Sequence, residues 1–245
     1  MTDFAYSPMF PQVADDTAYE LVSTEHVEMV ELGGEEFLKV DPEALRLLAQ
    51  RAFTDISHLL RSSHLAQLRA ILDDPEATQN DRFVALEMLK NAVVAADGLL
   101  PMCQDTGTAI ISGTRGDRVL VTGDDGEALS RGVYDTYQQS NLRYSQLAAT
   151  SMFDEVNTAT NLPAQIDLYA GKGTEYKFAF IQKGGGSANK TFLHQKTKAV
   201  LNPEGLRDFI KSAILDLVTS ASPPYHHAID IGGTSADYKL KTLKH

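Results

Sequence analysis

Cys103 is the only cysteine among 245 residues. It lies in the segment Leu100–Gly107, where polar and turn-forming residues follow the sulfur immediately. A buried, inert thiol usually lies within a periodic apolar pattern, so this setting predicts an irregular and partly open backbone. The segment therefore suits a reactive thiol, with a buried structural thiol as the alternative. A single cysteine also excludes an internal disulfide.

Two glycine-rich segments follow predicted strands, Gly184–Thr191 and Gly232–Ser235. Loops of this kind expose backbone N–H groups and can bind an anion. The first is similar to a nucleotide-binding P-loop, except that Asn189 stands directly before the lysine, at a position where that pattern requires glycine. We therefore expect a carboxylate ligand rather than a nucleotide, and an ordinary connection between elements is the alternative for both segments.

His226 and His227 are adjacent on a predicted strand. Successive strand residues point to opposite faces, so this pair is not expected to bind one metal ion. The other histidines have no ligand spacing.

The composition is that of a globular protein, with 43% hydrophobic and 22% charged residues. A net charge of −11 argues against binding to a phosphate backbone, so we expect no nucleic-acid partner. No apolar run has membrane-spanning length, and the start Met1–Phe4 lacks a basic segment leading into an apolar one. We expect a cytoplasmic protein with no membrane partner.

The elements that must position these segments begin with an N-terminal arm, residues 1–40. It ends in a small hairpin formed by Val27–Leu32 and Glu36–Val40. Asp41-Pro42-Glu43 then combines a cap, a first-turn proline and an acidic residue, and Asn202-Pro203-Glu204 repeats this signature. With the apolar spacing that follows, these signals predict helices over Pro42–Arg61, Ser63–Asp73, Asn80–Ala96, 124–140 and 203–218.

From Thr108 onward, strand-like runs alternate with helices. The expected strands are Ala109–Ile111, Val119–Val121, Gln165–Tyr169, Tyr176–Ile181 and His226–Ile231, and a helix-like tail ends at His245. The short loop Ala170–Gly173 predicts that the strands on either side of it form a hairpin. We expect one mixed α/β (α+β) unit over residues 41–245, with small mixed sheets surrounded by helices.

The combined motifs resemble those of the class I, iron–sulfur-dependent fumarate hydratases. The segments that carry the resemblance are Pro101–Thr108, Asn141–Ser145, Gly184–Lys190, Pro223–His226 and Ile231–Ser235, with Asn157-Thr158 and Asn161–Ala164 between them. They occur in the family's order, and the resemblance runs from Phe4 to the last residue.

The resemblance implies reversible addition of water to fumarate, which gives malate. It also implies a [4Fe–4S] cluster with three cysteine ligands and one iron open to substrate, which acts as a Lewis acid. By position, Cys103 would be a cluster ligand, and Gln104 and Asp105 would be catalytic and substrate-binding residues beside the open iron. Arg143 would bind a substrate carboxylate, for which its planar fork is well suited, and Gly186 would offer a backbone contact.

Two of the carried-over roles have a purely structural alternative. Asp105 could cap a turn, because aspartate before Thr-Gly is common in turns. Arg143 follows a predicted helix and could interact with the last carbonyls of that helix.

The sequence departs from the family pattern at two places. Ser222 occupies the position of a second cysteine ligand, and an alkoxide is a poorer ligand for iron–sulfur chemistry than a thiolate. The chain also stops before the region that supplies the family's third cysteine and its proton-abstracting residue. We therefore expect an N-terminal catalytic-domain fragment that is inactive alone and needs a C-terminal half or companion subunit.

Family members are dimers, so we expect a homodimer. The alternatives are a hydro-lyase for tartrate or mesaconate, a non-catalytic module that binds dicarboxylates or assembles subunits, and a P-loop phosphotransferase.

Overall fold

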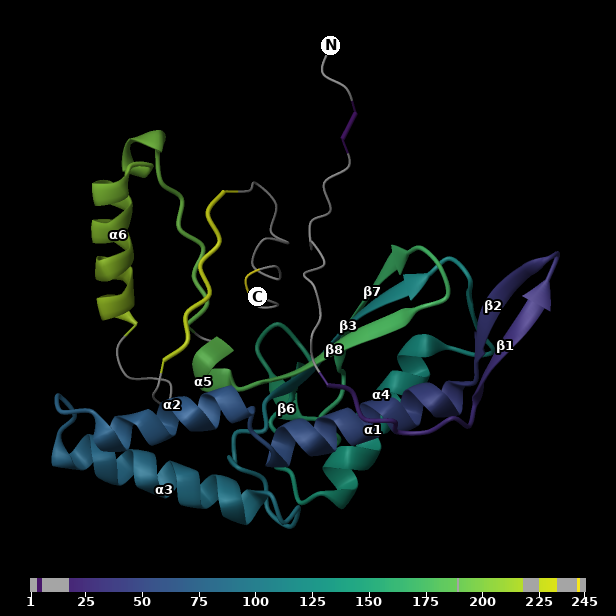
Figure 1. Ribbon diagram of the computed structural model, residues 1–245, viewed down its shortest axis with the longest axis horizontal. Helices are drawn as coiled ribbons and strands as arrows, with labels where there is room; N and C mark the ends of the chain where they lie inside the picture. Colours follow the sequence, from purple (N-terminus) through teal and green to yellow (C-terminus); the bar gives the residue numbers. More distant parts are fainter. Residues whose placement is uncertain (1–3, 6–17, 189, 218–224, 233–241, 243–245) are drawn as a thin grey trace. The chain divides into compact units, whose positions relative to one another are not determined.

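Strand β3, Thr108–Gly116, is the middle strand of a three-stranded sheet of order β7-β3-β8 (Figure 1). β7, Gln165–Gly171, runs parallel to β3, and β8, Tyr176–Lys183, runs antiparallel to it. β3 contains the buried run Ala109–Ile111, and a strand with two neighbours is best placed to bury such residues. The sheet is therefore mixed, as expected.

The predicted hairpin between β7 and β8 is wrong, because β3 lies between them. The end of β3 also forms hydrogen bonds with the segment that connects β7 to β8. The amide of Gly116 donates to the carbonyl of Glu175 at 2.9 Å, and the amide of Asp117 donates to the carbonyl of Gly171 at 3.1 Å. These contacts join segments far apart in sequence, and no local pattern predicts them.

The structure, a computed structural model, describes residues 4–5, 18–188, 190–217, 225–232 and 242. It comprises two compact units, one of residues Leu21–Gly185 and one formed by residues 1–20 and 186–245. The division of the chain into an arm of residues 1–40 and a single unit of residues 41–245 remains a prediction.

Helices α1, Pro42–His58, and α4, Asp125–Gln139, pack against the β7-β3-β8 sheet and form the main hydrophobic core (Figure 1). The helices approach closely at Gly132, where an added Cβ would lie 2.4 Å from the carbonyl oxygen of Arg46. Beside this contact, the guanidinium of Arg46 pairs with the carboxylate of Asp135 at 2.7 Å. A small residue and a partly buried ion pair therefore fix how the two helices cross.

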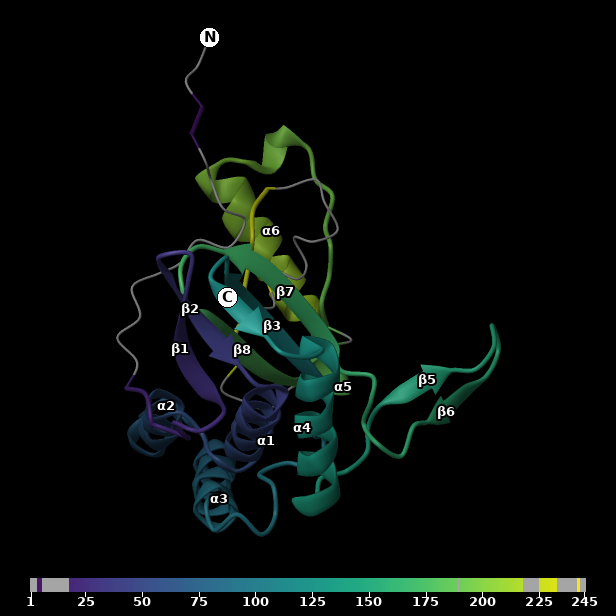
Figure 2. The same ribbon diagram turned by 90° about the vertical axis from the view of Figure 1, so that its right-hand side faces the viewer.

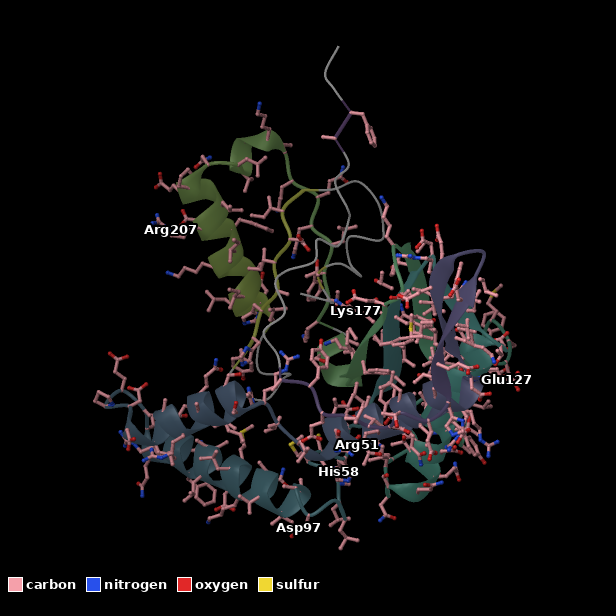
Figure 3. All side chains as sticks on the ribbon, turned by 45° about the vertical axis from the view of Figure 1, so that its right-hand side comes forward. Arg51, His58, Asp97, Glu127, Lys177 and Arg207 are labelled. Atoms are coloured by element: carbon pink, nitrogen blue, oxygen red, sulfur yellow. The ribbon has the colours of Figure 1, made fainter. Side chains whose placement is uncertain are left out.

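Helix α1 begins as predicted, with the Asp41 side chain accepting the amide of Glu43 at 2.8 Å. It ends at His58, three residues before the predicted end at Arg61, because Leu59 adopts an extended conformation. The last-turn carbonyl of Ser57 accepts the amide of Met102 at 3.0 Å. The loop containing Cys103 thus contacts the end of α1, and Figure 3 labels His58 there.

Helices α2, Ser62–Asp73, and α3, Gln79–Ala95, pack side by side as an antiparallel pair (Figure 1). α3 starts with a capping box between Thr78 and Asp81. Both helices match the predicted ones to within a residue at each end.

The smaller sheets include elements that sequence patterns predicted and elements that they did not. The hairpin of β1, Val27–Leu32, and β2, Glu35–Val40, is confirmed, and β4, Val119–Val121, pairs with β2 in parallel. Strands β5, Leu147–Ala149, and β6, Glu155–Asn157, were not predicted, because they contain at most one β-branched residue each, whereas β4, which is equally short, contains two. They form a hairpin that projects from the rest of its unit (Figure 2).

The second unit contains the short helix η1, Lys198–Val200, and helix α6, Pro203–Asp216. α6 begins with the predicted cap, in which Asn202 accepts the amide of Gly205 at 2.8 Å. Figure 3 shows Arg207 on this helix. The four-residue helix α5, Gly185–Ala188, lies at the boundary of the two units.

The strand predicted at His226–Ile231 is wrong, because this segment has no regular secondary structure. A strand needs a neighbour for its backbone groups, and no described strand pairs with it. The predicted tail helix lies outside the described residues, apart from Thr242, which is helical. Among the described residues, no helix is both long and apolar enough to cross a membrane.

Candidate active site

The loop that contains Cys103 starts beyond the C-terminus of α3 and ends where β3 begins. We call residues Leu100–Gly107 the cysteine loop. Its residue Met102 is held from both sides, since the amide donates to Ser57 of α1 and the carbonyl accepts the side-chain amide of Asn91 of α3 at 2.7 Å. Two helix ends therefore position the backbone next to the cysteine.

Cys103, Gln104 and Asp105 follow at the surface, and all three are exposed. The amide of Asp105 donates to the sulfur of Cys103 at 3.4 Å. The sulfur is the atom of cysteine that attacks electrophiles and binds metals, and here it is accessible from outside the loop. The prediction of an open, irregular segment is confirmed, and the alternative of a buried structural thiol is wrong.

Thr106 and Gly107 turn back into the protein and are buried. The hydroxyl of Tyr137, on α4, donates to the carbonyl of Thr106 at 2.6 Å and accepts the amide of Gln182 at 3.2 Å. Burial raises the pKa of Tyr137 to about 12, so its hydroxyl keeps its proton and remains a donor at neutral pH. Ser57 completes this cluster through a hydrogen bond of 2.9 Å with Gln182.

The cysteine loop meets Gly184, the first residue of the first glycine-rich segment, because β3 and β8 are antiparallel and Thr108 pairs with Lys183. The loop before β3 and the residues after β8 thus lie at the same end of the sheet. A Cβ at Gly107 would lie 2.2 Å from the Lys183 carbonyl oxygen, and one at Gly184 would lie 2.7 Å from a carboxylate oxygen of Asp105. Burial also lowers the pKa of the half-buried Lys183.

Arg143 follows α4 and has an exposed side chain. Its backbone carbonyl accepts the hydroxyl of Thr106, so its segment is tied to the cysteine loop. The guanidinium makes no ion pair or hydrogen bond within the described part of the chain, which argues against the alternative that it caps α4. This leaves all five N–H donors of a planar fork available to an anion.

The structure therefore brings together Cys103, Gln104, Asp105 and the Arg143 backbone through neighbouring loops of one unit. Gly186 begins the other unit and is exposed, and its role remains a prediction. Ser222, Asn189 and Gly233–Ser235 lie outside the described residues. Sequence patterns did not single out Tyr137, Gln182 or Asn161, although Asn161 falls within a segment that carries the family resemblance.

One thiolate does not complete the ligand set of a [4Fe–4S] cluster. Cys103 is exposed and fits one ligand position, but among the described residues no group of three or more His, Cys, Asp and Glu side chains could hold a metal ion. The chain alone therefore does not fit the cluster, and no chemical step through one is derived for it.

The P-loop alternative loses support from the element that follows β8. In a P-loop a full helix follows the glycine-rich turn, and its N-terminus faces the phosphates. Here β8 leads into α5, which has only four residues.

A hollow of about 520 Å³ lies at the opposite end of β3. Its lining is Glu35, Phe37, Asp117, Arg118, Lys172 and Gly173. None of the motif residues contributes to it, and Arg118 is 3.9 Å from the carboxylate of Glu35. We do not assign the reaction to this hollow.

Fold and site together define a mixed α/β domain that presents a thiol, a carboxylate and a guanidinium on loops at one end of a sheet. The family model described as fumarate hydratase (Fumerase) matches residues 46–245. The sequence is 58% identical over 248 residues to fumarate hydratase 1, mitochondrial, of Leishmania major, and 57% identical over 241 residues to fumarate hydratase class I, anaerobic, of Escherichia coli K12. The chain belongs to the class I fumarate hydratase family.

The two alignments cover 100% and 98% of this chain but only 45% and 44% of the relatives. The chain thus spans less than half the length of these proteins and corresponds to their N-terminal portion. A more distant relative is the L(+)-tartrate dehydratase subunit alpha of Escherichia coli, 26% identical over 160 residues, which is 62% of this chain and 50% of that subunit.

Proposed function

We propose that the chain forms the N-terminal part of a fumarate hydratase, which adds water across the double bond of fumarate to give malate and catalyses the reverse reaction. The observation that carries this proposal is the similarity of at least 57% identity along nearly the whole chain. The joined loops of Cys103, Asp105 and Arg143 support it, because a dicarboxylate substrate requires a cation placed beside the reacting groups.

The roles proposed for individual residues are those that the family resemblance implies, and the exposure of Cys103, Gln104, Asp105 and Arg143 is compatible with them. Cys103 contributes one thiolate ligand to a [4Fe–4S] cluster, Ser222 occupies the second ligand position, and the third ligand comes from outside this chain. Arg143 binds one substrate carboxylate through its planar fork. Gln104 and Asp105 contact the substrate from the cysteine loop, and Gly186 offers a backbone contact.

The chain alone is inactive under this proposal. One cysteine cannot fill three thiolate positions, and Ser222 stands at the second of them. The partners are a C-terminal half or companion subunit and a second copy in a homodimer. The cytoplasm is our proposed location, although the Leishmania major relative is named mitochondrial.

The test is anaerobic iron–sulfur reconstitution with a visible spectrum and a fumarate hydration assay. The chain is assayed with and without the C-terminal half of a class I relative, and with Ser222→Cys in parallel. We expect a four-iron cluster and turnover only when the second half and the restored thiol are both present.

A stoichiometric cluster with turnover in the isolated chain would contradict the proposed incompleteness. No cluster in any combination would favour the second candidate, a non-catalytic module that binds dicarboxylates or assembles subunits, for which Ser222 is the supporting observation. Turnover of tartrate or mesaconate in preference to fumarate would identify a related hydro-lyase, which the similarity to the tartrate dehydratase subunit makes worth assaying.

A further inference from the structure

Asn161 is a fully buried polar residue in the loop before β7. Its backbone φ of 56° lies in the left-handed region, which asparagine tolerates better than most residues. Burying an amide costs free energy unless its polar atoms are paired, so a wholly buried asparagine must have specific partners. The proposed chemistry gives this residue no role.

The partners of Asn161 come from two different segments. Its side-chain nitrogen donates to the carbonyl of Gly107, in the cysteine loop, at 2.9 Å. Its side-chain oxygen accepts the amides of Ser145 at 2.8 Å and Gln146 at 2.9 Å, just beyond Arg143. One side chain therefore bridges the cysteine loop and the segment that follows Arg143.

A second link runs beside the first. The buried hydroxyl of Thr106 donates to the carbonyl of Arg143, and Thr106 directly precedes Gly107. The two adjacent residues that end the cysteine loop are thus each tied to the arginine segment, Asn141–Gln146. The side chains of Thr106 and Asn161 are both buried, and the bond from Asn161 to Gly107 is buried as a whole, which strengthens it relative to a bond in water.

We propose that Asn161 and Thr106 are positioning residues that set the spacing between the Arg143 guanidinium and the exposed thiol and carboxylate of the cysteine loop. The effect of this spacing on substrate binding rests on the proposed function, because the spacing would determine how a dicarboxylate is held. A small misplacement of a carboxylate-binding group can cost a large factor in rate. The bridge itself is a property of this chain and can be measured without turnover.

Three variants separate the links. Asn161→Asp keeps an acceptor for the amides of Ser145 and Gln146 but places a carboxylate oxygen against the Gly107 carbonyl. Asn161→Ala removes both sides of the bridge. Thr106→Val keeps the shape of the side chain and removes only the link to the Arg143 carbonyl, so it tests the inference without changing Asn161.

Asn157→Asp is the matched control. The amide of Asn157 donates to the carbonyl of Tyr144 at 2.8 Å and its oxygen accepts the amide of Ala159 at 2.9 Å. It therefore makes the same kind of contact with the arginine segment without contacting the cysteine loop.

The order of the cysteine loop can be observed directly, because a trifluoromethyl label on the only cysteine reports on position 103 alone. In the full chain we expect Asn161→Asp and Thr106→Val to shift the fluorine resonance toward that of the free label. Its transverse relaxation rate should fall about twofold, and Asn157→Asp should leave both quantities unchanged. Hydrogen exchange at Ser145 and Gln146 should rise about tenfold in Asn161→Ala but not in Asn161→Asp.

An unchanged fluorine spectrum in both Asn161→Asp and Thr106→Val would overturn the inference, as would an equal change in Asn157→Asp. If Asn161→Asp fails to fold, Thr106→Val decides the outcome. In the Ser222→Cys protein reconstituted with its C-terminal half, the bridge predicts a raised KM for fumarate when Thr106→Val is added, with an intact cluster spectrum. Absence of turnover in the Ser222→Cys protein without Thr106→Val would instead contradict the proposed function and leave the fluorine result standing.

Discussion

Gly107 is the residue on which the cysteine loop depends most directly. Its φ is 58°, and an added Cβ would collide with the backbone of Lys183. Gly33 has a similar φ of 65°, but nothing lies within 4 Å of the place where its Cβ would be. Comparing a substitution at Gly33 with the same substitution at Gly107 therefore separates the free-energy cost of a left-handed backbone from the cost of a close contact.

We expect Gly33→Ala to lower the free energy of unfolding by about 1 kcal/mol, which is the strain of a positive φ alone. Gly107→Ala should lower it by about 3 kcal/mol or more, because β8 or the loop must also move. Urea denaturation followed by circular dichroism measures both. Equal losses would mean that the loop can move away from β8 at little cost.

The hydroxyl of Tyr137 gives a second prediction at the residue scale, this one dependent on pH. Because burial raises its pKa from 10.0 to about 12, the folded state holds a proton that the unfolded state has lost between these values. The stabilising effect of the hydroxyl is therefore fully present below pH 10 and is lost as the pH rises toward 12.

Tyr137→Phe should cost about 1–3 kcal/mol at pH 8, since it leaves the Thr106 carbonyl without its donor. The difference between wild type and variant should shrink when denaturation is repeated above pH 10. Tyr134→Phe is the control, because the Tyr134 hydroxyl makes no hydrogen bond with the described residues. A difference that stays constant up to pH 12 would contradict the shifted pKa of Tyr137.

At the scale of elements, the crossing of α1 and α4 determines where Tyr137 and Arg143 lie. Gly132→Ala would place a methyl group against the backbone of Arg46, and we expect a loss of about 2 kcal/mol or more. Gly126→Ala, in the first turn of the same helix, meets only a side-chain oxygen at 3.3 Å and should be neutral or stabilising by up to about 1 kcal/mol. Thermal unfolding of both variants checks the contrast, and a harmless Gly132→Ala would mean that the helices can separate freely.

Local sequence signals predicted the elements that depend on local physics. Asp41 and Asn202 cap α1 and α6 as expected, because a cap and its helix are neighbours in the chain. The place of β3 between β7 and β8 was missed, since it arises from pairing between distant segments. The β5–β6 hairpin was missed because its strands have at most one β-branched residue each, whereas the equally short β4 has two.

The candidate site likewise has one part that the local sequence predicted and one part that it did not. The exposed cysteine loop followed from the residue types around Cys103. The tie between this loop and Arg143 did not, because it is made by backbone carbonyls and by Asn161, whose sequence neighbours resemble those of an ordinary turn.

At the scale of the whole molecule, α3 exposes apolar side chains that a separately stable domain would usually cover. Leu86 and Val93 lie seven residues apart on one face of this helix and are 40% and 72% exposed. Such a surface favours association with another protein surface, so the isolated chain should form concentration-dependent oligomers. Sedimentation velocity over a range of concentrations measures this.

The double substitution Leu86→Lys with Val93→Lys should shift the chain toward monomer. Glu87→Lys, on the same helix, changes the net charge by the same amount without removing an apolar group, and it should have little effect. A wild-type chain that stays monomeric at every concentration would argue against α3 as a contact surface.

The order of strands in the β7-β3-β8 sheet also has a consequence for synthesis. β3 leaves the ribosome before either of its neighbours has been made, although it is the middle strand. Until β7 and β8 have been synthesised, both edges of β3 lack a partner strand and its apolar residues Ile110 and Ile111 are uncovered. A strand in this state pairs readily with other chains. A nascent chain that pauses before Lys183 would expose this strand, and we expect chaperones to bind the protein during that interval of translation.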